Sequence, residues 1–270
     1  MRLLSGLLTA AALLCGCATP RPPTPEPPAP PTPTTFAGFD TWRYPGDDAL
    51  RAWREASPYR WVGYYLPAPC RRDSSWVGRR ASLERMGWGV AVLYVGQQVF
   101  EGQPPPPPDS PAPIRCSRTL LSEAQGGREA ADAVAQAAAE GFPPGTTVFL
   151  NVERSETLPA AFTAYYRAWM DGVLRDGRYR PGTYAHRRNA DDLFALARDA
   201  YRAAGRTEAP PFWVAGGAGF ALDQPPEAVG VPYAAAWQGA LDVPRTWGGV
   251  TITVDENVAR RPSPSAPGSE

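Results

Sequence analysis

Strand-like and helix-like segments alternate five times along this 270-residue chain, and that alternation constrains the fold more than any other feature. Short apolar runs bounded by glycine or proline predict strands, and apolar residues at helical spacing predict the helices between them. After the fifth pair, three more strand-like runs follow with little room for helices between them. The predicted strands are 36–40, 60–66, 89–95, 146–153, 180–185, 211–215, 232–238 and 249–255, and the predicted helices are 47–57, 77–86, 122–140, 158–174 and 190–204.

Regular alternation of strand and helix implies a parallel sheet with right-handed crossovers, and eight strands are enough to close a barrel. We therefore predict an α/β fold, an irregular TIM-like barrel of five βα units followed by three closing strands. An open doubly wound sheet is the alternative. A nucleotide-binding version of that sheet has no support, because no glycine-rich phosphate loop follows the first strand.

The N-terminus has the layout of an export signal. Arg2 supplies one positive charge, and residues 3–14 form an apolar run that is too short to span a membrane. Residues 14–17 read Leu-Cys-Gly-Cys, which resembles the cleavage box of bacterial lipoproteins. We expect residues 1–16 to be a lipoprotein signal peptide and Cys17 to carry acyl chains that anchor the protein in a membrane. A plain secretory signal with incidental cysteines is the alternative.

Much of the proline lies outside the predicted strands and helices. Residues 17–35 read as the lipidated cysteine followed by an extended Pro-rich tether, and residues 260–270 as a disordered polar tail. A third Pro-rich stretch, residues 99–121, is either an ordered cover or a floppy insertion. The folded domain is therefore expected to cover residues 36–259.

Two cysteines, Cys70 and Cys116, remain in the expected mature chain besides Cys17. Exported proteins form disulfides, so we expect these two to pair and to join the third Pro-rich stretch to the loop after the second strand. Two free buried thiols are the alternative.

Charge and histidine content limit the partners and cofactors of the chain. Basic and acidic residues number 27 each, which leaves no basic excess for nucleic acid. His186 is the one histidine, so a two-histidine metal site and a Ser-His-Asp triad lose support. We expect no cofactor, no metal, a monomer and an exported position in the cell envelope. Ala18 after Cys17 implies the outer membrane if the cell is Gram-negative.

Three of the predicted strands end in an acid, namely Asp40, Glu153 and Asp255. The C-terminal ends of barrel strands form the face on which such folds carry out their chemistry. In a closed barrel the first and last strands are neighbours, so Asp40 and Asp255 should lie side by side with Glu153 across the mouth. Two close carboxyl groups do not both ionise readily, so one of their pKa values should be raised.

Aromatic residues accompany these acids, and flat apolar rings beside carboxylates suit the faces of sugars. Any single ring is better explained as part of the barrel core. The rings expected near the mouth are Trp42, Tyr64, Tyr94, Tyr184, Trp213 and Trp237.

Seven short segments, taken in chain order, carry a family resemblance: Gly38–Thr41, Val62–Tyr65, Gly87–Trp88, Tyr94–Gln97, Phe149–Glu153, Pro181–Tyr184 and Trp247–Asp255. Together they resemble a bacterial family of glycoside-hydrolase-like domains, distantly related to the Chalaropsis-type lysozymes of glycoside hydrolase family 25. The resemblance implies five βα units with three closing strands, and Glu153 as the general acid. It further implies that Asp40 and Asp255 bind or position the sugar and that Tyr184 assists.

Asn151 departs from the pattern of those lysozymes, which have Asp two residues before the acid. A neutral amide cannot act as nucleophile or stabilise an oxocarbenium ion by charge, although it can orient the acetamido group of an N-acetyl sugar. Three functions stay open: hydrolysis of a cell-envelope glycan such as peptidoglycan with Glu153 as acid/base, including a substrate-assisted route; glycan binding without catalysis; and a scaffold. The side chains expected to contact the glycan are Asn151, Tyr184, Tyr64, Trp213 and Gln238.

Overall fold

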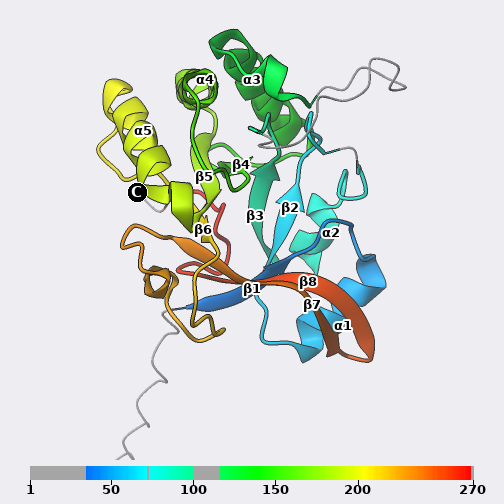
Figure 1. Cartoon of the computed structure of the whole chain (residues 1–270). Coiled ribbons are helices and arrows are strands. Elements are labelled where there is room, and N and C mark those ends of the chain that lie inside the picture. The colour runs from blue at the N-terminus through cyan, green and yellow to red at the C-terminus, as the bar shows by residue number, and fades with distance from the viewer. Residues whose placement is uncertain (1–34, 72, 100–115, 269–270) are drawn as a thin grey trace, which may run out of the picture. The chain divides into compact units, whose positions relative to one another are not determined.

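The computed structural model describes residues 35–71, 73–99 and 116–268. In that part of the chain, eight strands form one closed barrel whose strand order follows the sequence, as predicted (Figure 1). Strands β1 to β7 pair in parallel with their neighbours, whereas β8 is antiparallel to both β7 and β1. The strands are β1 (Phe36–Asp40), β2 (Trp61–Tyr65), β3 (Gly89–Tyr94), β4 (Thr147–Val152), β5 (Arg180–His186), β6 (Phe212–Ala215), β7 (Ala236–Trp247) and β8 (Val250–Ala259).

An α-helix follows each of the first five strands, which confirms the five predicted βα units (Figure 1). Local signals explain where these helices begin and end. The Ser122 side chain accepts a hydrogen bond from the backbone N–H of Gln125 at the start of α3, and Gly177 ends α4 with a φ of 78°. The helices are α1 (Asp47–Ala56), α2 (Arg80–Arg85), α3 (Glu123–Ala139), α4 (Ala160–Asp176) and α5 (Ala190–Ala203).

Aromatic rings from facing strands fill the interior of the barrel. Trp61 and Trp213 meet edge to face with ring centroids 5.4 Å apart, and Phe149 lies 5.9 Å from Trp213. All three side chains are buried. Edge-to-face packing stabilises aromatic pairs beyond the area that they bury. These three rings therefore form a well-packed layer beneath the mouth of the barrel.

The long hairpin of β7 and β8 differs most from the predicted strands. We expected strands at 232–238 and 249–255, but the pair runs from Ala236 to Ala259 with a tight turn between Trp247 and Val250. Because β8 runs back down the barrel, Asp255 lies inside this strand rather than at its end. It still reaches the mouth, since it pairs in register with Asp40 on β1.

The C-terminal segment corrects another expectation, because residues 260–268 are packed and not a disordered tail. Ser265 is fully buried; its hydroxyl accepts the backbone N–H of Val92 at 2.7 Å, and its carbonyl accepts that of Thr147 at 2.9 Å. Ser263 accepts the N–H of Val90 at 3.0 Å in the same way. The segment therefore satisfies backbone groups of β3 and β4 around the point where the pairing of these strands begins, which a polar composition alone does not reveal.

Residues 1–16 and 17–34, expected to be the signal peptide and the lipidated tether, lie outside the described residues, as does most of the Pro-rich stretch 99–121. Among the residues that are described, no helix has the length and apolar character needed to cross a membrane.

Candidate active site

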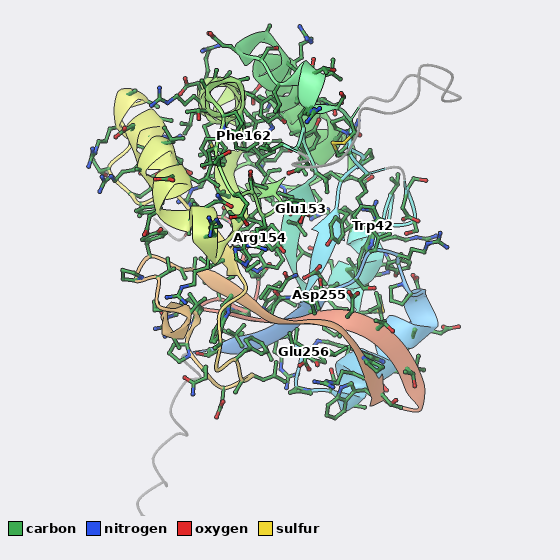
Figure 2. All side chains as sticks on the ribbon, in the orientation of Figure 1. Trp42, Glu153, Arg154, Phe162, Asp255 and Glu256 are labelled. Carbon is green, nitrogen blue, oxygen red and sulfur yellow. A yellow bond between two sulfur atoms is a disulfide. The ribbon has the colours of Figure 1, made fainter. Side chains whose placement is uncertain are left out.

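The three predicted acids line one cavity of about 440 Å³ at the mouth of the barrel. Figure 2 shows Glu153 just past the end of β4 and Asp255 on β8, with Trp42 after β1. The cavity is also lined by three of the side chains predicted to contact a glycan, namely Asn151, Tyr184 and Gln238.

Asp40 is the most deeply buried of the acids, with 3% of its surface exposed. Its Oδ1 accepts the Tyr65 hydroxyl at 2.7 Å, and its Oδ2 accepts the side-chain amides of Gln238 and Asn257, each at 2.8 Å. Burial raises the pKa of Asp40, while these three donors work in the opposite direction. Gly63 makes room for this carboxyl group, since a Cβ there would lie 2.5 Å from the Asp40 Cβ.

Gln238 joins Asp40 to Asp255. The Tyr184 hydroxyl donates to its Oε1 at 2.6 Å, which turns its Nε2 toward Oδ2 of Asp40 at 2.8 Å and Oδ2 of Asp255 at 3.2 Å. The other Asp255 oxygen accepts the backbone N–H of Asp242 at 2.7 Å. Burial, followed by the charge of Asp40, raises the pKa of Asp255 to about 7, as expected for one member of a close pair of acids.

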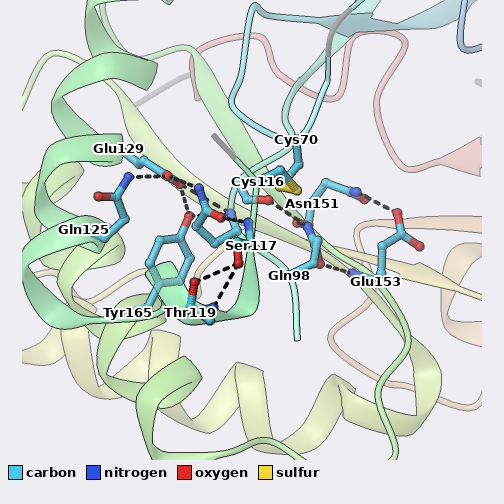
Figure 3. Close-up of a disulfide and its surroundings, with 12 residues drawn as sticks. Cys70, Gln98, Cys116, Ser117, Thr119, Gln125, Glu129, Asn151, Glu153 and Tyr165 are labelled. Atoms are coloured by element: carbon cyan, nitrogen blue, oxygen red, sulfur yellow. Dashed lines mark hydrogen bonds between the residues drawn. A yellow bond between two sulfur atoms is a disulfide. The ribbon is translucent and has the colours of Figure 1, made fainter. Parts of the chain in front are cut away.

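Glu153 is held on the opposite side of the mouth by amides. Its Oε1 accepts the side-chain N–H of Asn151 at 2.8 Å. The buried Gln98 side chain accepts the Glu153 backbone N–H at 2.9 Å and donates to the Asn151 carbonyl at 2.8 Å (Figure 3). A neighbouring parallel strand would make the same two bonds, one on either side of Val152, so the Gln98 amide extends the sheet past the end of β3.

Gln98 is itself held through its neighbour Gln97, which connects it to α3 and to the residue after the disulfide. The Gln97 side chain donates to Glu129 at 2.6 Å and accepts the backbone N–H of Ser117 at 2.8 Å. Ser117 follows Cys116, which is bonded to Cys70 as predicted. The disulfide therefore connects the loop after β2 to the segment that positions the Glu153 strand end.

Two residues predicted to contact a glycan do not line the mouth. Tyr64 points away from the barrel axis, where its hydroxyl donates to Glu140 and its ring packs on Phe142. Trp213 is fully buried under Tyr184, with ring centroids 5.0 Å apart, so it supports the mouth from below. Two further rings expected at the mouth also pack elsewhere, Tyr94 against Trp169 and Trp237 against Phe220.

Tyr65 takes the place that we expected for Tyr64. It lines the cavity, and burial together with the charge of Asp40 raises its pKa well above the usual value. Side chains alternate along a strand, so Trp61, Gly63 and Tyr65 share the inner face of β2. That alternation was available in the sequence. Asn257 and Gln98, in contrast, carry no pattern that marks them as site residues.

His186 also lines the cavity, and its Nδ1 accepts the backbone N–H of Arg188 at 3.1 Å. Burial and the charges of Arg154 and Arg188 lower its pKa, so the ring is neutral at pH 7. Among the described residues, no group of three or more His, Cys, Asp or Glu side chains is placed to hold a metal ion. The groups that line the cavity include carboxylates, amides, two phenols and the His186 imidazole.

Comparison with known proteins agrees with the barrel fold. Residues 51–259 match the family of Rv2525c-like, glycoside hydrolase-like domains. Among curated proteins, none matches the sequence significantly.

Solved structures share the fold at low sequence identity. A B. stearothermophilus protein is 19% identical, with a TM-score of 0.52 over 83% of this chain and 95% of that one. The modular autolysin LytC of Streptococcus pneumoniae, solved with a synthetic peptidoglycan ligand, is 14% identical, with a TM-score of 0.53 over 83% of this chain and 46% of that one. GHIP, a glycosyl hydrolase 25 of the same organism, is 11% identical, with a TM-score of 0.51 over 83% of this chain and 86% of that one. At these identities the likeness shows the fold alone.

Proposed function

This chain belongs to the Rv2525c-like family of glycoside-hydrolase-like domains, and from that premise we propose that it hydrolyses a cell-envelope glycan of the peptidoglycan kind. The observation that carries the proposal is the convergence of Asp40, Glu153 and Asp255 on one cavity. Most glycoside hydrolases use two carboxyl groups with different tasks at one sugar ring. The peptidoglycan ligand seen with LytC, a neighbour in fold, supports this substrate class.

Glu153 is the general acid in this proposal. Asn151 occupies its Oε1, so Oε2 carries the proton that passes to the leaving glycosidic oxygen as the bond to the anomeric carbon breaks. Asn151 itself carries no charge and supplies no nucleophile. The attacking atom is therefore the acetamido carbonyl oxygen of an N-acetyl sugar, which forms a new bond to the same carbon. This bond closes a ring that contains the acetamido group. Water then attacks the anomeric carbon and breaks the new bond, with Glu153 accepting a proton of the water.

Asp255 orients the acetamido group by accepting its N–H, and it does so in the ionised form. Asp40 is too deeply buried to contact the sugar directly, and it positions Gln238 and Tyr65 instead. The proposed roles are thus shared between Glu153, an exposed acid just after β4, and the pair of Asp40 on β1 and Asp255 on β8, which Gln238 bridges.

The test is the release of reducing ends from peptidoglycan and from N-acetylglucosamine oligomers by the wild type and by Glu153→Gln. We expect the variant to lose roughly 10²- to 10⁴-fold in turnover, the usual contribution of a general acid, with its folding unchanged by circular dichroism. Equal turnover in the two proteins would refute the role of Glu153.

Glycan binding without hydrolysis is the second candidate, and Asn151 is the observation that favours it. It predicts that the wild type binds these oligomers but releases no reducing ends. In that case Asn151→Asp, which restores the carboxylate of the related lysozymes, is the variant in which to look for turnover.

We also propose that the protein acts as a monomer anchored to a membrane through acyl chains on Cys17, with residues 18–35 as a tether. The sequence of residues 1–17 supports this step. Cys17→Ala should move the protein from the membrane fraction to the soluble fraction. If the fractionation of this variant is unchanged, the anchor is not Cys17.

A further inference from the structure

We propose that the mouth contains a second sugar-binding subsite, in which the indole of Trp42 is the platform for the ring next to the one held by Glu153 and Asp255. The protein would then select glycans of two or more sugar units. This inference rests on the proposed function and adds the length of the ligand to it.

A second cavity of about 470 Å³ adjoins the first. Four residues line both cavities, namely Asp40, Trp42, Tyr65 and Asp255. Of these two cavities, Glu153 lines only the first, whereas Trp42 lines both. One continuous ligand can therefore extend from Glu153 across Asp255 onto the indole.

Exposed apolar surface is concentrated at this place. Among the described residues, the large hydrophobic side chains that are exposed are Trp42, Val77 and Leu241, at 49%, 43% and 58%. Trp42 and Leu241 both line the mouth cavity. A single exposed hydrophobic residue needs no explanation, but two around a cavity lined by acids indicate a ligand with both apolar and hydroxyl-bearing surfaces.

The Trp42 ring is held in place before any ligand arrives. The guanidinium of Arg71 lies 4.9 Å from its ring centroid and 4.6 Å from that of Tyr65. The Arg71 side chain is fully buried, donates to the Trp42 carbonyl and pairs with Asp73 at 3.1 Å. Arg71 follows Cys70 of the disulfide. A platform fixed by a buried cation loses little conformational freedom when a sugar stacks on it, which favours binding.

Polar groups surround the platform where sugar hydroxyls need partners. Besides the four shared residues and Val254, the second cavity is lined by the polar residues Thr41, Arg43, Asp242 and Thr253. Asp242 has a φ of 52°, and it is the one residue other than glycine with a positive φ in the described part of the chain. The irregular pairing of β7 with β8 at this point turns the Asp242 N–H to Asp255. Such backbone strain is concentrated at functional sites, and here it presents a carboxylate beside the indole.

The experiment is titration calorimetry of the full chain with N-acetylglucosamine oligomers of one to four units. For the wild type we expect the affinity to rise from one unit to two. Trp42→Ala should remove most of that rise, weakening binding of the dimer roughly 5- to 30-fold, as for truncation of an anchoring aromatic residue, and should weaken binding of the single sugar much less. Trp42→Phe, which keeps a ring, should retain part of the rise, and Val77→Ala, an exposed residue away from the mouth, should retain all of it.

The outcomes separate the subsite from the function on which it rests. If the wild type and Trp42→Ala bind the dimer equally well, the subsite is absent although the protein binds glycan. If Trp42→Ala weakens the single sugar as much as the dimer, Trp42 belongs to the first subsite and the two-ring site is refuted. If the wild type binds no oligomer of any length, both the subsite and the proposed function fail.

Discussion

The two sides of the mouth are built in different ways. Asp40 and Asp255 face each other across paired strands, and Gln238 and Asn257 from the barrel interior bind Asp40. Glu153 lies just past the end of β4, and the side chain of Gln98 takes the place of a neighbouring strand. The β1–β8 side is thus positioned by backbone pairing and the core, whereas the β4 side depends on an irregular segment connected to a disulfide. Substitutions of single side chains on the first side should therefore cost stability, and those on the second side should cost geometry, whereas loss of the disulfide should cost both.

Removing the disulfide should have the largest effect on stability. Cys70 and Cys116 are 46 residues apart, and a bond across such a loop typically stabilises the folded state by about 2–4 kcal/mol. We expect Cys70→Ser with Cys116→Ser to lower the free energy of unfolding in urea by that amount. Turnover should also fall, because Ser117 and Gln97 are then less firmly placed. A variant that is less stable but equally active at low temperature would show that the disulfide does not help to position Glu153.

Asp40→Ala tests the β1–β8 side. It leaves the Tyr65 hydroxyl and the amides of Gln238 and Asn257 without their acceptor in a buried place, which should cost roughly 1–3 kcal/mol of unfolding free energy. Glu153→Ala is the matched control, since its side chain is at the cavity surface and its loss should change stability by less than about 0.5 kcal/mol. Equal destabilisation of the two variants would contradict the difference between the two sides.

Gln98→Leu tests the β4 side. The variant keeps the approximate size of the side chain but cannot bind the backbone of Glu153 or Asn151, so the strand end should shift. Small displacements of catalytic groups can lower rates as much as 100-fold, and we expect about a tenfold loss in kcat with KM nearly unchanged. Gln98→Glu, which keeps the acceptor for the Glu153 N–H, should retain more activity. A rise in KM with kcat unchanged would instead assign Gln98 to substrate binding.

The smallest expected effect is the pH dependence of stability that comes from Asp255. The pKa of Asp255 is raised to about 7 in the folded protein, so stability from this group is present at low pH and is lost as the pH rises from about 4 to 7. The carboxyl group is partly exposed, so we expect a loss of only about 1 kcal/mol. Turnover should change in the opposite direction and increase toward pH 7 as Asp255 ionises. Asp255→Asn should flatten the stability profile; a variant with the wild-type slope would assign the titration to another group.

The sequence predicted the barrel and the three acids because both follow from periodic patterns. The alternation of strands and helices predicts a closed barrel. In a closed barrel the first and last strands are neighbours, so Asp40 lies beside Asp255 whatever their separation along the chain. Tyr65 was missed although the inner face of β2 marked it. Gln98 and Asn257 could not have been chosen, because one lies in an irregular segment and the other acts through a carboxyl group 217 residues away. The packing of Ser265 was missed for a related reason, since its polar groups bind the backbone of distant strands.

A crystal structure of Glu153→Gln with an N-acetylglucosamine tetramer would show directly whether the acids at the mouth hold a glycan. We expect sugar rings in the mouth, with a glycosidic oxygen within hydrogen-bond distance of residue 153, an acetamido group at Asp255 and the next ring on Trp42. A tetramer bound away from the mouth, or rings that leave Glu153 and Asp255 on one side of the ligand with no glycosidic oxygen in reach, would contradict this expectation.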